Sequence, residues 1–251
     1  MSDELLTCRD VSCEFNIFLS LRNVSFSIRR GENVVIFGSE KSGADLICSV
    51  LSGMQPVGGD VLFKGRSIRG LSEAEMNRMR REVIYMQRNY GLISNMTAEE
   101  NIALPLRYHS PLSSAEIDEL VETIITDLHL DYCRDMRPIH LKPSEILKTA
   151  YGRAIALDPS LVLIEHPLEG QCLINTATFL KQLKLRCEDP ERSVAIVTYE
   201  PLRFLEFADR FIMFDFGKIV FDGDRRAMEN PDNEFARQFL GFSGDGPMQI
   251  L

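Results

Sequence analysis

The sequence predicts an α/β fold built on a mixed sheet, with an antiparallel β-subdomain and an inserted α-helical subdomain. An apolar strand from Val34 to Gly38 ends in a glycine-bounded loop and passes directly into an amphipathic helix. Two other runs, LVLI at 161–164 and VAIVT at 194–198, are almost wholly apolar, as expected of parallel strands covered on both faces. From residue 97 to about residue 140 the pattern changes to helical periodicity, which predicts the insertion.

The first third of the chain predicts an antiparallel β layer. LLTCRDVSCEF at 5–15 and LRNVSFSIR at 21–29 alternate apolar and polar residues, which is typical of strands with one solvated face. PVGGDVLFKGRSI at 56–68 places Gly-rich turns around three apolar residues and adds a further edge to this layer. Arg30-Gly31-Glu32 makes a turn into the apolar strand.

The later elements follow from periodicity and from helix start and stop signals. A charged helix is expected over 73–81, and a strand over 83–87. In the insertion, Ser113-Ser114 followed by Glu116 resembles a helix N-cap. Asp158-Pro159 ends a helix over 144–157. The remaining expected elements are a helix around 175–187, a strand over 211–214, and a hairpin across 215–218 into a strand over 219–221.

These elements are interpreted as one domain over residues 1–251. It contains the inserted helical subdomain at 97–145 and a C-terminal extension at 230–251. The extension is expected either to pack against a neighbouring subunit or to cover this chain's own core through Phe235, Phe239 and Leu240.

Composition and charge exclude several classes of function. The 251 residues are 45% hydrophobic and 26% charged, the mix of a soluble globular protein. The net charge of -9 argues against nucleic acid as a partner and against broad attachment to an anionic membrane, since both need clustered Lys and Arg. The chain shows no signal-peptide pattern and no apolar run of membrane-spanning length, so a cytosolic protein is expected. Six scattered cysteines without a C-x-x-C pair favour reduced thiols.

The loop after the first apolar strand has the frame of a phosphate-binding P-loop, G-x-x-x-x-G-K-[S/T]. In that motif, backbone N–H groups hold the phosphates, the Lys reaches the β- and γ-phosphates, and the hydroxyl ligates Mg²⁺. Here the two glycines have the right separation, but an Ala and an Asp replace the Lys and the hydroxyl residue. On the loop alone, an ordinary βα unit is equally consistent. The candidate loop residues are Gly38, Ser39, Glu40, Lys41, Ser42, Gly43, Ala44 and Asp45.

The order of motifs resembles the nucleotide-binding subunit of ATP-binding-cassette (ABC) transporters over roughly residues 5 to 243. Gln87 stands where that family has its Q-loop residue, and YGRAIALDPSLVLIEHP leads into a Walker B strand that ends at Glu165 and His166. GQCL, with Cys172, lies where the D-loop belongs, and VTYEP, with Tyr199, lies where the switch histidine belongs. The family's LSGGQ signature is replaced by Leu141, Lys142, Pro143, Ser144 and Glu145.

More narrowly, two stretches resemble the ATPase subunit of the Mla-type, MCE-associated lipid transporters. They are ENIALPLRYHSPLS in the insertion and NPDNEFARQFLGFSGDGP near the C-terminus.

The departures from the family pattern fall where the chemistry would occur. The resemblance implies that hydrolysis needs a Walker A Lys and hydroxyl, a Walker B Asp and Glu, and a switch His; this chain has Ala44, Asp45, Glu165, His166 and Tyr199 instead. A carboxylate in the first turn of a helix supplies the anion that the helix N-terminus favours, so Asp45 is interpreted as a built-in plug. We therefore predict no catalytic residue, no metal site, and weak or absent binding of ATP and Mg²⁺.

Two other motifs are interpreted as inactive. Pro143 lacks a backbone N–H, which impairs the signature segment that should complete a site on a partner. Cys172 is expected to be a buried small residue and not a nucleophile, because no group is evidently placed to activate it.

The predicted function is that of a pseudo-ATPase: an ABC-type subunit that docks on the permease of a lipid-transport complex and stabilises or regulates the assembly. The resemblance implies an integral-membrane permease, a second ABC ATPase-like subunit in a homo- or heterodimer, and an MCE protein as partners. It also implies a peripheral location at the cytoplasmic face of the inner membrane. Gln87, with Tyr90, Leu92 and Ile93 beside it, resembles the family's groove for a permease coupling helix, although these apolar residues can equally pack between subdomains.

Two alternative functions stay open at this point. One is an active ATPase in which Lys41, Glu165 and His166 take unorthodox roles. The other is a module that senses a nucleotide or another anion without turnover.

Overall fold

A six-stranded sheet forms the centre of the protein, in the order β10-β9-β3-β8-β7-β6. The computed structural model describes residues 3–16 and 19–248. Five strands run parallel and only β10 is antiparallel to its neighbour. Every residue of β3, β7 and β8 is buried, as their apolar sequences predict. The strands are β3 (Asn33–Gly38), β6 (Val83–Met86), β7 (Leu161–Glu165), β8 (Ser193–Thr198), β9 (Arg210–Asp215) and β10 (Lys218–Gly223).

The predicted antiparallel layer is present as a second, four-stranded sheet in the order β2-β1-β4-β5. Its strands are β1 (Glu4–Glu14), β2 (Ser20–Arg29), β4 (Gly58–Phe63) and β5 (Arg66–Ser67). Apolar residues of this layer pack with one face of the central sheet around the segment that follows β3. That segment consists of a 3-10 turn, η1 (Ala44–Leu46), and α1 (Ile47–Leu51).

The segment after β3 differs from the amphipathic helix that the sequence predicts. The α-helical part is only five residues long, and four of them are buried. The helix ends before Gly53, whose φ of 67° lies in the left-handed region that stops helices. Because the β layer lies on one side and the central sheet on the other, this short helix has hardly any solvated face.

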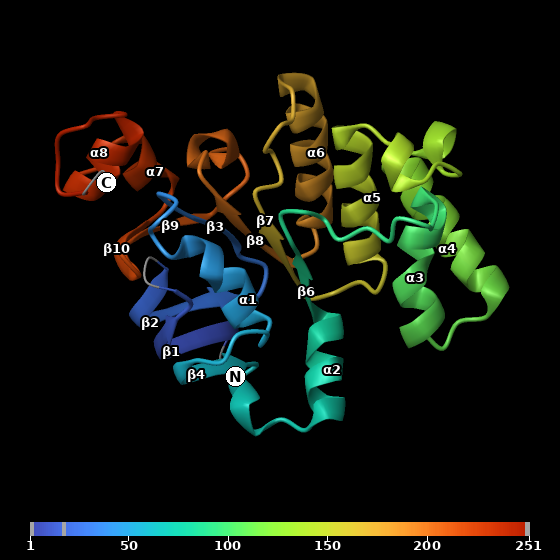
Figure 1. The fold of residues 1–251 in the computed structure, drawn as a ribbon, viewed down its shortest axis with the longest axis horizontal. Coiled ribbons are helices and arrows are strands. Elements are labelled where there is room, and N and C mark those ends of the chain that lie inside the picture. The colour runs from blue at the N-terminus through green and yellow to red at the C-terminus, as the bar shows by residue number, and fades with distance from the viewer. Residues whose placement is uncertain (1–2, 17–18, 249–251) are drawn as a thin grey trace.

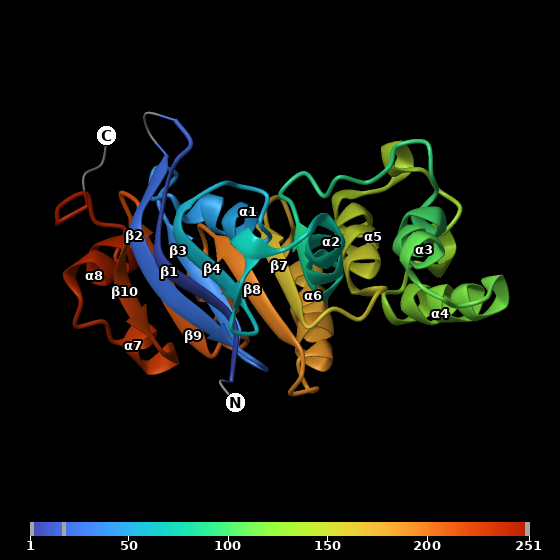
Figure 2. The same cartoon turned by 90° about the horizontal axis from the view of Figure 1, so that it is seen from below.

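The buried residues of the helices from α3 to α8 pack with the other face of the central sheet, whereas Met79 of α2 packs with the β layer and α1. Figures 1 and 2 place α3 and α4 at one end of the molecule, and β10, α7 and α8 at the opposite end. Capping boxes begin α2, α3 and α4, and the box at Ser113 and Glu116 confirms the N-cap that the sequence predicts. The longer helices are α2 (Glu73–Glu82), α3 (Ala98–His109), α4 (Ser114–Asp127), α5 (Pro143–Ile155) and α6 (Leu173–Arg186). The shorter ones are η2 (Ile68–Gly70), η3 (Asp131–Cys133), η4 (Pro138–His140), η5 (Pro201–Phe204), α7 (Arg225–Glu229) and α8 (Glu234–Leu240).

Within the described residues, no helix combines the length and the apolar character needed to cross a membrane.

The described part of the C-terminal extension packs on its own chain. The ring centroid of Phe239 lies 5.3 Å from that of Phe37 in β3, in an edge-to-face arrangement. Gln238 is 5% exposed, and its side-chain amide makes two hydrogen bonds with the backbone of Met248. The Met248 N–H donates to Gln238 Oε1 at 2.6 Å, and Gln238 Nε2 donates to the Met248 carbonyl at 3.2 Å. Phe235 and Leu240 also pack against the main core, as one of the two expectations states. Ile250 and Leu251 lie outside the described residues.

The two hydrogen bonds between Gln238 and Met248 predict that the tail stabilises the monomer. Truncation after Ser243 removes both hydrogen bonds to Met248 together with its side-chain packing, so the free energy of unfolding should fall by about 1 kcal/mol. Thermal and urea unfolding measure this loss. Deletion of residues 249–251 alone is the matched control, because it keeps Met248. Equal unfolding curves for the full chain and the Ser243 truncation would contradict the stabilising role.

Candidate functional site

Three loops bring the candidate residues together at one edge of the central sheet. Asp45 lies in η1 just after the β3 loop, His166 directly follows β7, and Tyr199 directly follows β8. Because these three strands are parallel neighbours, their carboxyl ends meet at the same edge, where ligands of open α/β sheets bind. Residues separated by 121 and 154 positions in the sequence therefore come into direct contact.

Both carboxylate oxygens of Asp45 have a partner from another loop. The Nε2 atom of His166 lies 2.9 Å from Asp45 Oδ1, and the Tyr199 hydroxyl donates to Oδ2 at 2.7 Å. The His166 and Tyr199 rings lie with their centroids 4.2 Å apart. Asp45, His166 and Tyr199 are called the plug cluster below, since they lie at the position that the sequence assigns to a polyphosphate.

His166 is held tightly in this cluster. Its side chain is 4% exposed, and its backbone N–H donates to the Val197 carbonyl at 2.8 Å. Its φ of 45° is in the left-handed region, which costs a non-glycine residue roughly 1–2 kcal/mol. The surrounding hydrogen bonds and burial hold the residue in this conformation.

The protonation states of the plug cluster reinforce its hydrogen bonds. Burial alone raises the pKa of Asp45, but the hydrogen bonds from His166 and Tyr199 together outweigh it, and the net pKa is lowered. Burial, and then the bond to Asp45, raise the pKa of Tyr199. At neutral pH the cluster therefore contains a charged carboxylate and a neutral phenol that donates to it.

Glu165 has partners of its own from the end of β6. The Tyr85 hydroxyl donates to one carboxylate oxygen, and the Arg88 backbone N–H donates to the other at 3.2 Å. Burial raises the pKa of Glu165. The Arg88 guanidinium binds both carboxylate oxygens of Glu169 at 2.6 and 2.5 Å, and it lies 5.7 Å from the centre of the Tyr199 ring.

Tyr85 and Arg88 are site residues that the sequence reasoning missed. The signal was their position near Gln87: Tyr85 lies on β6, which pairs with the Walker B strand β7, and Arg88 lies in the loop that follows β6. Gln87 itself is exposed and lines a small pocket with Tyr85, Arg88 and Glu165.

The glycine loop has a structural reason for its two glycines. A Cβ atom on Gly43, whose φ is 88°, would lie 2.5 Å from the Ser20 carbonyl oxygen, and one on Gly38 would lie 2.4 Å from that of Phe214. Loop N–H groups are also used internally: Ser42 donates to the Ser39 carbonyl at 2.9 Å and Ala44 to Ser42 Oγ at 3.2 Å. The frame of the loop is thus explained by packing without a phosphate.

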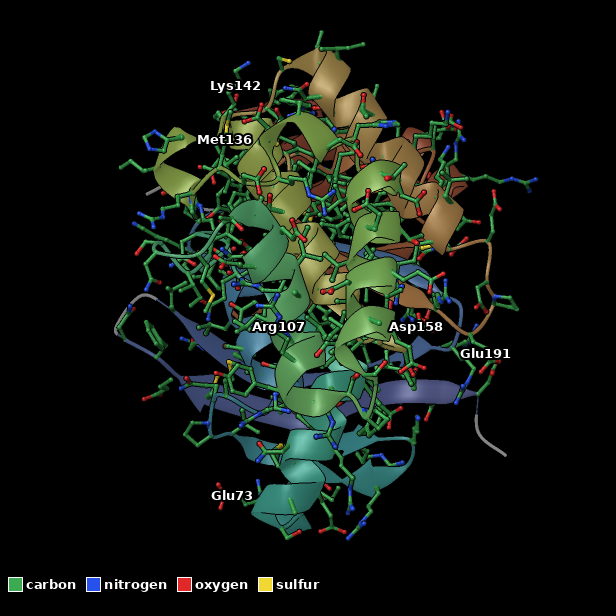
Figure 3. The ribbon with its side chains drawn as sticks, turned by 90° about the vertical axis from the view of Figure 1, so that its right-hand side faces the viewer. Glu73, Arg107, Met136, Lys142, Asp158 and Glu191 are labelled. Atoms are coloured by element: carbon green, nitrogen blue, oxygen red, sulfur yellow. The ribbon has the colours of Figure 1, made fainter. Side chains whose placement is uncertain are left out.

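The signature and D-loop candidates do not join the plug cluster. Glu145 is buried and accepts hydrogen bonds from Lys142 N–H and from the Tyr132 hydroxyl, both at 2.8 Å. Figure 3 places Lys142 with Met136 at one edge of the molecule, opposite Glu73 of α2. Among the described residues, no hydrogen bond or ion pair is found between residues 141–145 and Asp45, His166 or Tyr199.

The expectation that Cys172 is buried is wrong. Its side chain is exposed, because it precedes a first turn of α6 that projects into solvent, with Leu173 83% and Ile174 72% exposed. Within residues 3–16 and 19–248, no three His, Cys, Asp or Glu side chains are grouped so that they could hold a metal ion.

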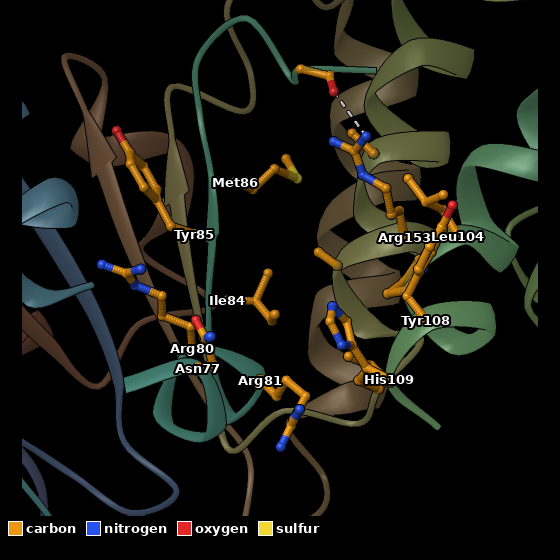
Figure 4. A pocket seen from close by; sticks show the side chains of 15 residues that line it. Asn77, Arg80, Arg81, Ile84, Tyr85, Met86, Leu104, Tyr108, His109 and Arg153 are labelled. Carbon is orange, nitrogen blue, oxygen red and sulfur yellow. Dashed lines mark hydrogen bonds between the residues drawn. The ribbon is translucent and has the colours of Figure 1, made fainter. Parts of the chain in front are cut away.

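A separate cleft of 670 Å³ lies between α2 and β6 on one side and α3 and α5 on the other (Figure 4). Of the residues expected to form a docking groove, Tyr90 and Leu92 pack against the core, as the packing alternative states, and Ile93 is 39% exposed. The cleft wall is formed instead by residues of β6, α3 and α5.

The plug cluster predicts an acid-sensitive contribution to stability. Asp45→Ala removes the acceptor of the buried His166 ring and of the half-buried Tyr199 hydroxyl, so the free energy of unfolding should fall by about 1–3 kcal/mol at neutral pH. Because the folded-state pKa of Asp45 lies below its ordinary value of 3.8, this contribution is present above that value and is lost as the pH falls through the folded-state pKa. Urea unfolding of both proteins across that pH range measures the difference. Glu40→Ala, an exposed acidic residue of the same loop, is the control; an equal loss in both variants would contradict the prediction.

Comparisons with known proteins agree with the fold. Residues 21–196 match the ABC transporter family. The chain is 29% identical to the sulfate/thiosulfate import ATP-binding protein CysA of Pseudomonas syringae pv. tomato, over 94% of this chain and 72% of that protein. It is 27% identical to the intermembrane phospholipid transport system ATP-binding protein MlaF of Escherichia coli, over 97% of this chain and 91% of MlaF.

Solved structures show the same fold. A dimeric ATP-binding cassette in a post-hydrolysis state, bound to ADP and Pi, superposes with a TM-score of 0.80 at 22% identity, over 88% of this chain and 99% of that chain. The family match covers most of the central sheet and the whole insertion. This chain therefore belongs to the ABC transporter family and has the fold of its ATPase domain.

Proposed function

We propose that this chain is a non-hydrolysing ABC-type subunit, which docks on the permease of a membrane lipid-transport complex and stabilises or regulates that assembly. The observation that carries the proposal is the plug cluster. Asp45 places a carboxylate, with both oxygens already hydrogen-bonded, where a P-loop would hold phosphates.

The residues present do not fit Mg-ATP. Phosphate oxygens entering the loop would meet the Asp45 carboxylate, and no Lys follows Gly43 to offset that repulsion. Displacing Asp45 would leave the buried His166 and the half-buried Tyr199 without their acceptor, and an unsatisfied buried group costs about 1–3 kcal/mol. Nucleotide binding would have to overcome this loss before gaining any contact.

The same contacts count against the unorthodox enzyme. His166 Nε2 already faces Asp45, and both oxygens of Glu165 accept hydrogen bonds from β6 and its following loop. A general base must lie within hydrogen-bond reach of the proton it takes. Both candidate groups are instead bound to neighbouring side chains.

A structural role also agrees with how the cluster connects to the rest of the site. Tyr85 and Arg88 join the end of β6 to Glu165 and Glu169 in the loop after β7, and Arg88 lies over Tyr199 after β8. The relative positions of these three loops are thus set by side chains of this chain. Because β6 also forms part of the wall of the cleft in Figure 4, the same side chains bear on the position of that wall.

The proposed partners follow from family membership and from the MlaF similarity. A permease, a second ABC ATPase-like subunit and an MCE protein are proposed, at the cytoplasmic face of the inner membrane. The lipid cargo is supported by the length of the match to MlaF, an ATP-binding protein of an intermembrane phospholipid transport system. CysA, a sulfate/thiosulfate import protein, has a similar sequence identity to this chain. The proposal of a lipid cargo therefore depends mainly on the two stretches in the insertion and the C-terminal extension that resemble the Mla-type ATPase.

The first prediction of this proposal is the absence of ATP hydrolysis. Loss of one well-placed electrostatic group typically lowers a rate about 10²–10³-fold, and several are replaced together here. Phosphate release by the pure protein and by its complex should equal the background. Lys41→Ala is the matched control: a rate above background that this substitution abolishes would defeat the proposal and support the unorthodox enzyme.

The second prediction is weak or absent Mg-ATP binding. Calorimetry should detect no binding in the micromolar range, because Asp45 is charged and already bonded. The double substitution Ala44→Lys with Asp45→Ser should strengthen binding if the loop backbone accepts phosphate, while hydrolysis should stay at background because Glu165, His166 and Tyr199 are unchanged. Micromolar affinity in the unmodified protein would favour the nucleotide-sensing alternative.

A further inference from the structure

Three polar atoms from three different elements are buried without a hydrogen-bond partner among the described residues. They are the Tyr151 hydroxyl in α5, the Nε atom of Arg186 in α6 and the Oδ1 atom of Asn33 at the start of β3. Tyr151 is 1% exposed, and Arg186 and Asn33 are each 8% exposed. Buried polar groups in folded proteins are nearly always paired, so each of these atoms needs an explanation.

The packing of α5 on α6 brings the first two atoms toward each other. Figures 1 and 2 show α5 and α6 side by side, and the Tyr151 ring meets the Phe179 ring of α6 edge-to-face, with the centroids 5.2 Å apart. Phe179 and Arg186 are buried and lie about two turns apart, so they share one face of α6. Burial raises the pKa of Tyr151, and the charge of Arg186 opposes this rise, so the phenol lies within electrostatic reach of the guanidinium.

Cys187 connects Asn33 to the same region. Burial raises the pKa of the Cys187 thiol to about 11, while the charge of Arg186 and a side-chain hydrogen bond with Asn33 oppose the rise. The pKa of Tyr151 also responds to Cys187. Tyr151, Arg186 and Asn33 therefore converge beside Cys187, at the C-terminal end of α6.

Neighbouring contacts keep two of these residues in the interior. The terminal nitrogens of Arg186 donate to Asp158 Oδ1 at 3.4 Å and to the Pro159 carbonyl, which leaves Nε over. The backbone of Asn33 is fixed on both sides by Asp209, whose Oδ2 accepts from the Asn33 N–H at 2.9 Å and whose N–H donates to the Asn33 carbonyl at 2.8 Å. Bulk water at the surface therefore does not reach the three atoms.

The geometry points to one internal water molecule, bound between α5, α6 and β3, that accepts hydrogen bonds from the Tyr151 hydroxyl and from Arg186 Nε–H and donates one to Asn33 Oδ1. A buried water typically makes about three hydrogen bonds to groups that would otherwise be unsatisfied. Two donors and one acceptor match what a single water offers.

An enclosed ion fits the three atoms less well than water does. A cation would meet the Arg186 guanidinium, which carries the same charge and can only donate. A halide would accept from the two donors, but Asn33 Oδ1 offers it only lone pairs. A species that pairs with all three atoms has to accept and donate, as water does.

The water joins the far ends of elements that lead to the candidate site. β3 runs into the glycine loop, α5 begins at Pro143 in the signature segment, and α6 begins directly after Cys172. A bridging buried water is costly to remove, so it holds these three elements together at the edge of the sheet opposite the plug cluster. The site goes beyond the proposed function, because it is independent of whether the chain binds or hydrolyses ATP.

The first experiment is a crystal structure of the unmodified chain at a resolution that shows ordered water. A density peak should lie within hydrogen-bond distance, about 2.7–3.2 Å, of all three atoms. A bromide soak of the same crystals distinguishes a halide: an anomalous peak at this position would overturn the water. A structure with no peak between the three atoms would overturn it as well.

The substitution Tyr151→Phe has opposite effects with and without the water. With it, the variant loses a hydrogen bond, and the equilibrium constant for unfolding should rise about fivefold. Without it, the substitution removes an unsatisfied buried hydroxyl, so the constant should stay the same or fall. Tyr108→Phe, at a side chain that is 75% exposed, is the matched control and should unfold as the unmodified chain does. Urea unfolding measures the three proteins, and an unchanged or lowered constant for Tyr151→Phe contradicts the water site.

A double-mutant cycle tests whether Tyr151 and Asn33 share one partner. Tyr151→Phe and Asn33→Ala each remove one bond to the same water, so their effects on the unfolding constant should not multiply. Independent effects, in which the double variant shows the product of the two single changes, would mean that no shared water links the two side chains.

Discussion

The structure of the site depends on the Asp45 carboxylate and its two donors. The Asp45 carboxylate is partly buried, which is costly unless it is hydrogen-bonded, and His166 and Tyr199 supply one partner for each oxygen. Without Asp45, the His166 ring and the Tyr199 hydroxyl would each lose an acceptor. The three residues therefore depend on one another, and both Asp45 oxygens are satisfied by side chains of this chain.

The effect of this cluster extends through two further pairs. Tyr85 binds Glu165, and Arg88 binds Glu169 while lying over the Tyr199 ring. The loops after β6, β7 and β8 are thus joined by side chains that all belong to this chain. If a ligand held these loops, their arrangement would follow its concentration. Because side chains hold them, the arrangement is a fixed property of the fold, which suits a subunit that supports an assembly.

The fold was largely predictable from the sequence, because buried parallel strands such as LVLI and VAIVT have a simple apolar pattern and glycine marks the loops. The place of Asp45 at the start of the helical segment after β3 was predictable as well, since a helix start favours an anion. The contacts of Tyr85 and Arg88 with Glu165 and Glu169 were not predictable from the sequence. They depend on which way each side chain points at the four-residue strand β6 and on the pairing of β6 with β7. The five-residue α1 and the exposed Cys172 were also missed, since both depend on what packs around them.

The short strand β6 connects two sites of opposite charge. Successive side chains of a strand point to opposite faces, so Tyr85 faces Glu165 while its neighbours Ile84 and Met86 face the cleft. On one side lie the carboxylates of Asp45, Glu165 and Glu169; on the other lie arginines without a carboxylate. Movement of β6 would disturb both sites at once, because a four-residue strand held by β7 has no room to move one face alone. The hydrogen bond from Tyr85 to Glu165 and the pairing with β7 thus bear on the position of the strand that forms part of the cleft wall.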